Sequence, residues 1–187
     1  MKRRDLLSYL GATTALTLSG CSVVKEGKHI YHLYLDVKTA TKYIDGILKI
    51  AKAILPILKS VGMFGMVATA TIAVAIYTLG SEATAFNHVT NGSLEVDYND
   101  TNIKTAYDSL IAAAKVVVDS IKLATEYWIN SLSSSQKTEV IPYISAATTL
   151  LNSSEGLVKR LAPYPSETGM TPIQALKISE YARQSIN

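Results

Sequence analysis

An uninterrupted apolar segment, residues 61–80, dominates the hydropathy pattern of the chain. No charged residue occurs between Ser60 and Ser81. A helix of about 20 apolar residues is long enough to span the hydrocarbon core of a bilayer. The segment is rich in glycine, alanine and threonine and has one leucine, Leu79, whereas membrane-spanning helices usually contain more large aliphatic residues. We therefore expect a helix buried at the centre of a bundle, and membrane insertion is the alternative.

Apolar residues at alternating steps of three and four predict a first long helix over residues 30–59. Pro56 should kink this helix because proline removes a backbone donor. The end of the helix resembles a basic amphipathic segment at a membrane surface, with lysines beside its apolar stripe. The alternative is an ordinary bundle helix with a solvated lysine face. The stripe comprises Ile30, Leu33, Val37, Ala40, Ile44, Ile47, Ala51, Ile54 and Leu58.

The clearest periodicity lies between residues 103 and 128, where apolar positions follow strict steps of four and three. Such a seam packs either within the chain or against a second copy of it, as in a homo-oligomer. A further helix should run from about Thr138 to Ala162, and a last one should start at the capping box Thr171-Pro172-Ile173-Gln174. The seam comprises Ile103, Tyr107, Leu110, Ala114, Val117, Ile121, Ala124 and Trp128.

Residues 81–102 interrupt these helices with a polar stretch that contains the turn signal Asn91-Gly92. Leu94, Val96 and Tyr98 alternate with polar residues as in a strand, but the pattern offers no second strand to pair with it. We therefore expect an all-α fold: four or five helices in an up-and-down bundle, with the very hydrophobic segment 61–80 as its central helix.

Composition places this pattern in a membrane-associated class. The chain has 187 residues, of which 48% are hydrophobic and 18% charged, which argues against disorder. A net charge of +3 does not suggest nucleic acid binding, and one cysteine excludes an internal disulfide. Residues 21–60 carry seven lysines against three acidic residues, so the basic part of the chain lies near its start.

The first 20 residues have the layout of a secretory signal peptide, with a basic start, a weakly apolar stretch and then small residues. Its end, Leu18-Ser19-Gly20-Cys21, resembles the lipobox of bacterial lipoproteins. The resemblance implies that the Cys21 thiol is acylated and that the chain is cleaved just before it. We assign residues 1–20 to the signal, 21–29 to a lipid-anchored tether and 30–187 to the helical domain. The alternative is a lone cysteine that follows small residues by chance.

The signal also bears on the export route and the destination. Arg3-Arg4 resembles part of a twin-arginine export signal, although Leu6 stands where that family usually has phenylalanine. Sec export is the alternative, and both routes lead out of the cytoplasm to the cell envelope. Under the enterobacterial sorting rule, Ser22 rather than aspartate after the cysteine implies the outer membrane, on its periplasmic side, if the organism has one.

No motif points to catalysis. The chain lacks a nucleophile elbow, a phosphate loop and a dinucleotide fingerprint, so we expect neither an enzyme nor a cofactor. His29 and His32 are three residues apart and His88 is distant, which is too little for a metal site.

These observations favour an envelope lipoprotein with a structural or protein-interaction role and a protein partner. One alternative is a membrane-active protein that inserts residues 47–80 into a bilayer. The other is a carrier of an apolar ligand, which would need a cavity among the helices.

Overall fold

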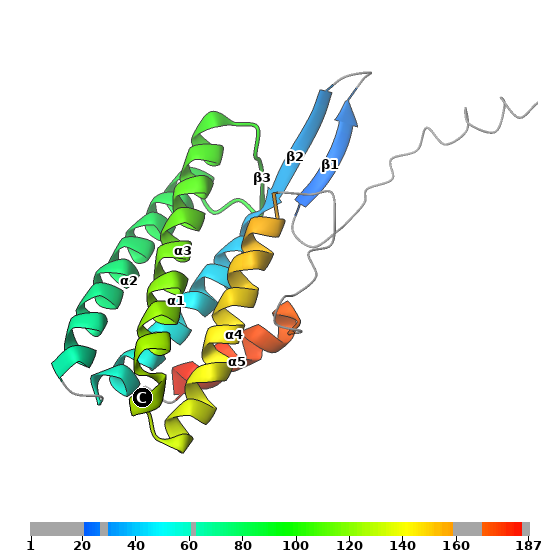
Figure 1. Ribbon diagram of the computed structural model, residues 1–187. Coiled ribbons are helices and arrows are strands. Elements are labelled where there is room, and N and C mark those ends of the chain that lie inside the picture. Colours follow the sequence, from blue (N-terminus) through cyan, green and yellow to red (C-terminus); the bar gives the residue numbers. More distant parts are fainter. Residues whose placement is uncertain (1–20, 27–29, 61–62, 159–169, 185–187) are drawn as a thin grey trace, which may run out of the picture.

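The computed structural model describes residues 21–26, 30–60, 63–158 and 170–184. Five α-helices make up most of these residues, which confirms the all-α bundle (Figure 1). Helices α1 to α4 run along one another, and the shorter α5 packs against α1 and α4. The helices are α1 (Val37–Lys59), α2 (Met63–Thr90), α3 (Thr101–Trp128), α4 (Ser134–Gly156) and α5 (Pro172–Gln184).

Helix α1 is the centre of the bundle, because it contacts each of the other four helices. Its apolar stripe from Ile44 to Leu58 is buried, as the periodicity predicted. The predicted start at Ile30 is wrong, however. Asp36 caps the helix, its carboxylate accepting hydrogen bonds from the Thr39 N–H at 2.8 Å and the Thr39 hydroxyl at 2.6 Å. The apolar stripe continued past this cap because Ile30, Leu33 and Val37 keep the helical spacing of three and four, although Ile30 and Leu33 belong to a strand.

A three-stranded antiparallel sheet precedes and flanks α1. Strand β2 (Ile30–Asp36) lies between β1 (Cys21–Glu26) and β3 (Glu95–Asp97). The strand-like alternation around Val96 therefore does have a partner, contrary to the prediction, since Val96 pairs with Leu35. The described part of the expected tether is likewise a paired strand: Cys21 lies opposite Leu35 and Glu26 opposite Ile30.

Helix α2 lies at the edge of the bundle, so the expectation that residues 61–80 form its central helix is corrected. One side of α2 packs on α1 and α3 through Ile72, Leu79 and Phe86, while the opposite side is exposed, with Tyr77 80% accessible. Small residues and threonines tolerate this exposure, since the threonine hydroxyls bond to carbonyls of the preceding turn, as Thr84 does to Gly80 at 2.9 Å. Within the described residues, no helix has the length and apolar character needed to cross a membrane.

The periodic seam of α3 packs inside the chain, against α2 and α4. Its positions from Ile103 to Ala124 are buried, so a second copy would have to use another surface. Tyr107 shows how the seam is completed: its ring packs on Phe86 at 5.5 Å between centroids, and its hydroxyl donates to the Ser154 carbonyl at 2.7 Å.

The last two helices begin with capping boxes. Helix α4 is capped by Ser133 and Gln136 and starts four residues earlier than predicted, which places Pro142 in its interior rather than near its first turn. The predicted box at α5 is confirmed: the Gln174 N–H donates to the Thr171 hydroxyl at 3.3 Å, and the Gln174 side chain accepts from the Thr171 N–H at 2.9 Å.

Candidate functional site

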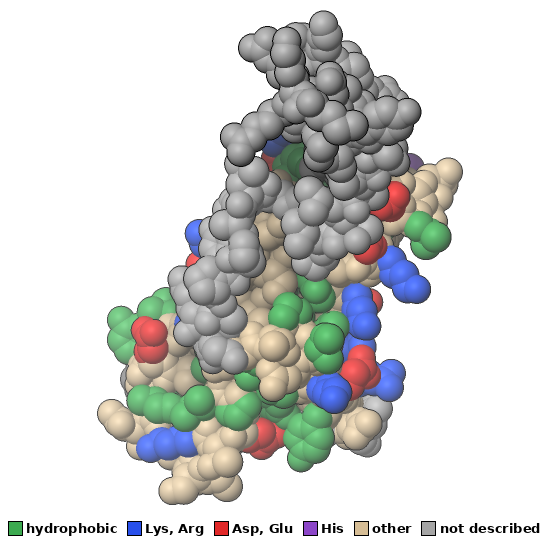
Figure 2. Space-filling model, turned by 90° about the vertical axis from the view of Figure 1, so that its right-hand side faces the viewer, with side chains coloured by type: hydrophobic (Ala, Val, Ile, Leu, Met, Phe, Trp, Pro, Cys, Tyr) green, Lys and Arg blue, Asp and Glu red, His purple; other side chains and the backbone are tan. Residues whose placement is uncertain are grey.

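A groove with a volume of about 900 Å³ runs between α1 and α5 and reaches the segment that joins α2 to β3. We call it the α1–α5 groove. Its lining combines basic, acidic and apolar side chains, and Figure 2 shows these three kinds interspersed on one face of the molecule. Its charged residues are Lys38, Lys42, Asp45, Lys49, Lys177 and Glu180, and its apolar and aromatic residues include Val37, Leu94, Ile173, Leu176 and Tyr181.

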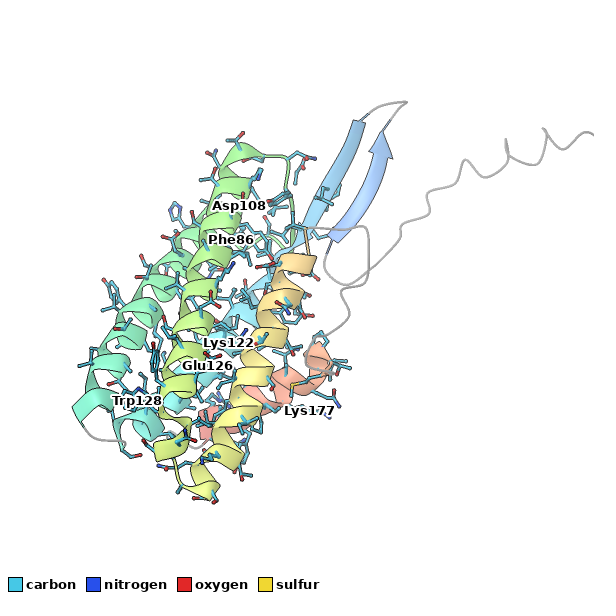
Figure 3. The ribbon with its side chains drawn as sticks, in the orientation of Figure 1. Phe86, Asp108, Lys122, Glu126, Trp128 and Lys177 are labelled. Carbon is cyan, nitrogen blue, oxygen red and sulfur yellow. The ribbon has the colours of Figure 1, made fainter. Side chains whose placement is uncertain are left out.

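Helical spacing places these residues along the groove. Lys38, Lys42 and Lys49 are separated by four and seven residues, which puts them on one face of α1. On α5, Ile173, Lys177 and Tyr181 follow steps of four, and the Lys177 side chain projects from that helix in Figure 3. Two helices that are far apart in sequence thus contribute one composite surface.

An ion pair between the two helices lies in the lining of the groove. Lys49 Nζ donates to Glu180 Oε1 at 2.5 Å, and Arg183 Nε lies 3.4 Å from the other carboxylate oxygen. The hydrogen bond from Lys49 holds the pKa of Glu180 below its usual range. By contrast, Lys38, Lys42 and Lys177 are exposed, and no carboxylate of the described residues lies within ion-pair distance of them. The lining thus holds four lysines and two carboxylates, and the groove has a net positive charge.

The pKa of Asp45 is shifted in the opposite direction to that of Glu180. Asp45 is an exposed residue, but partial desolvation of its carboxyl raises its pKa, although the nearby charges of Lys49 and Lys52 act to lower it. Because the ionised form is the disfavoured one in the folded protein, the group contributes stability below its unfolded pKa that is lost as the pH rises through the folded value.

Replacing Asp45 by asparagine should therefore raise the melting temperature at pH 7 slightly, since the neutral amide avoids the partial desolvation of a charge and solvent reaches this residue. Thermal unfolding across a pH series would measure this gain in melting temperature. The gain should disappear below pH 3.8, the ordinary pKa of aspartate, where the wild-type carboxyl is protonated in both the folded and the unfolded protein. A gain that stays constant down to pH 3 would contradict an ionisation effect.

The groove also carries exposed apolar side chains. Leu94 is 71% accessible, Ile173 69% and Tyr181 64%, and all three line it. Lysines interspersed with a leucine, an isoleucine and a tyrosine form an amphipathic surface, because tyrosine and lysine both combine an apolar body with a polar end.

The predicted lipidation residue, Cys21, lies close to one end of this groove. Cys21 pairs with Leu35, two residues before Val37, and the Val37 N–H donates to the Leu94 carbonyl at 3.0 Å. Strand spacing of about 4.8 Å and a rise of about 3.4 Å per residue place the Cα of Cys21 on the order of 10 Å from Val37 and Leu94. This proximity depends on the pairing of β1 with β2, which the residue pattern did not predict.

Large apolar side chains are also exposed on the outer sides of α2 and α3, two helices that contact each other and run antiparallel. We call this region the outer α2–α3 surface. Its large exposed side chains are Val67, Val74 and Tyr77 on α2 and Val116, Leu123 and Tyr127 on α3.

A polar cluster at the end of α3 is structural. Asp108 accepts hydrogen bonds from the Tyr98 hydroxyl and from Lys104 Nζ, each at 2.7 Å, so both carboxylate oxygens are used. Partial burial opposes ionisation, but these two hydrogen bonds outweigh it and hold the pKa of Asp108 below its usual range. Figure 3 shows Asp108 near Phe86 at this end of the bundle. The cluster ties the end of β3 to α3.

The histidines do not form a metal site within the described residues. No group of three or more histidine, cysteine, aspartate or glutamate side chains in this part of the chain could hold a metal ion. His88 is exposed on α2, and His29 lies outside the described residues. No protein-family model, no curated protein and no solved structure matches the chain.

Proposed function

We propose that this chain is a lipid-anchored protein of the cell envelope, whose helical bundle has a structural or protein-interaction role. This proposal rests mainly on the sequence Leu18-Ser19-Gly20-Cys21, which follows a basic N-terminal segment. The same signal places the protein outside the cytoplasm, and Ser22 favours the outer membrane where one exists.

The outer α2–α3 surface supports an interaction role. Large apolar side chains gathered on the surface of a protein mark sites of protein or membrane contact more often than singly scattered ones do. Tyr77 and Tyr127 are its most exposed members, and tyrosine is enriched in protein interfaces. A protein partner that covers this surface is therefore the interaction we expect.

The two alternative functions receive less support from the fold. Insertion of residues 47–80 would have to remove Ile47, Ile54 and Leu58 from the core, where each is fully buried. A carrier needs an apolar cavity that encloses its ligand. The α1–α5 groove is instead open at the surface and carries four lysines.

Acylation of Cys21 is the test of this proposal. In a bacterium that processes lipoproteins, the full chain should incorporate an alkyne-labelled fatty acid, and Cys21→Ala should abolish the label because no other cysteine is present. The matched control is Ser22→Ala, which should retain the label. Mass spectrometry of the labelled protein should find the acyl groups on a peptide that begins at Cys21.

An unlabelled wild-type chain that retains its first 20 residues would contradict the lipoprotein assignment. A label that persists in Cys21→Ala would do the same, because the acyl group would then be on another residue.

A further inference from the structure

We propose that the α1–α5 groove binds the headgroups of anionic phospholipids, so that the bundle makes a second contact with the bilayer that holds its lipid anchor. The position of the bilayer in this inference rests on the proposed function, since it assumes that Cys21 is acylated. The binding itself is a property of the groove and can be measured without the anchor.

The first argument is position. Val37 and Leu94 line one end of the groove, and the strand pairing of Cys21 with Leu35 places the anchor residue on the order of 10 Å from both. A lipid on Cys21 would therefore hold this end of the groove close to the headgroup layer, at a distance on the order of 10 Å. Because β1 is paired to β2 from its first residue, no free linker separates the anchor from the bundle.

The second argument is charge. Lys38, Lys42 and Lys177 project from α1 and α5 without an ion pair among the described residues, whereas the Glu180 carboxylate is already bound to Lys49. With the exposed Asp45 included, the lining holds four lysines and two carboxylates, so its net charge is positive. Lysines in such excess, facing a headgroup layer, are attracted by the negative surface potential of anionic lipids.

The third argument is the apolar rim. Leu94, Ile173 and Tyr181 are exposed beside these lysines. A soluble acidic peptide would satisfy the lysines but would leave exposed aliphatic side chains from two separate elements to be covered. A bilayer interface accepts both kinds of group, because apolar side chains enter the acyl boundary while the lysine ammonium groups stay at headgroup level.

The test is the binding of unacylated protein to lipid vesicles. Full-length chain carrying Cys21→Ser would be mixed at low salt with vesicles of phosphatidylglycerol and phosphatidylcholine, or of phosphatidylcholine alone, and sedimented. Binding should require phosphatidylglycerol and weaken with salt. Replacing Lys38, Lys42 and Lys177 by glutamine should lower the partition coefficient on the order of 100-fold, since each lysine near an anionic surface contributes about fivefold.

The matched control replaces three lysines outside the groove, Lys59, Lys115 and Lys122, by glutamine. It has the same net charge and the same signal segment as the groove variant. A difference in vesicle binding between the two is therefore due to the position of the lysines in the groove. Circular dichroism should give equal melting temperatures for both. Should the triple groove variant melt early, the single exposed substitution Lys42→Glu supplies the comparison and should lower binding more than tenfold.

Equal binding of the groove and control variants would overturn the proposal. Equal binding of the wild-type protein to both kinds of vesicle would also overturn it. So would displacement of the protein from the vesicles by a soluble polyglutamate peptide, if the groove variant does not bind that peptide. Because these proteins carry no acyl group, a failure here is separate from a failure of fatty-acid labelling at Cys21, which would instead overturn the proposed function.

Discussion

Replacing Ile54 by alanine is expected to lower the free energy of unfolding by about 2–5 kcal/mol, the range found for truncating a large aliphatic side chain in a core. Ile54 is fully buried on α1, the helix that contacts every other helix of the bundle. The lost carbons would leave a cavity where α1 meets its neighbours, because closely packed helices relax only in part.

Urea unfolding followed by circular dichroism would measure this loss. The matched control is Ile141→Ala, the same chemical change at a residue of α4 that is 53% accessible, and it should cost less than about 1 kcal/mol. Similar losses at the two positions would mean that α1 is not the buried centre of the fold.

Replacing Gly46 by leucine is expected to destabilise the protein by about 3 kcal/mol through overpacking. A Cβ at this position would lie 2.6 Å from the Leu150 side chain on α4 and 3.3 Å from the Ser179 hydroxyl on α5. Gly46 therefore allows α4 and α5 to approach the same turn of α1, and the remaining atoms of a leucine side chain would have no space between them.

The control for this substitution is Gly80→Leu in α2, where a Cβ meets no other atom within 4 Å. This variant should be more stable by roughly 0.5 kcal/mol, since leucine is a better helix former than glycine. Opposite signs for the two changes in thermal unfolding would support the packing explanation. Destabilisation by both would indicate instead that leucine is poorly tolerated in either helix for a reason other than space.

The sequence allowed the helices to be predicted where their apolar residues form one narrow stripe. The seam of α3, from Ile103 to Ala124, is buried as its strict spacing implied. Helix α2 has no such stripe: apolar and small residues surround it, so nothing in the pattern distinguished Leu79, which is buried, from Val74, which is exposed. Absence of charge predicted a buried helix, but it does not say which side of that helix is covered.

The start of α1 shows a second limit. Ile30 and Leu33 continue the three-and-four spacing of the α1 stripe, so the Asp36 cap was the local signal that separated β2 from α1. Without β2 in view, the strand around Val96 had no partner, and the sheet could not be assembled from the pattern.

The α1–α5 groove was the least predictable feature. The spacing of Lys38, Lys42 and Lys49 on one helical face is visible in the sequence, but these lysines are more than 120 residues from Ile173 and Tyr181 on α5. Only packing of α5 across α1 brings the two sets together. The lipidation of Cys21, by contrast, is a prediction from a local motif, because a signal of this kind consists of contiguous residues and does not depend on the fold.

The register of the β1–β2 hairpin has a mechanical consequence for an anchored protein. If the bundle is pulled away while Cys21 is held in the bilayer, the force enters at Cys21 and leaves through Leu35 and Asp36, at the same end of the hairpin. Such a load opens the strand pairs one after another instead of shearing all of them together. Once β1 has separated from β2, residues 21–32 would span up to roughly 40 Å, because residues 33–36 stay hydrogen-bonded to residues 95–98. The hairpin would thus serve as a reserve of chain length, released at low force while all five helices remain folded.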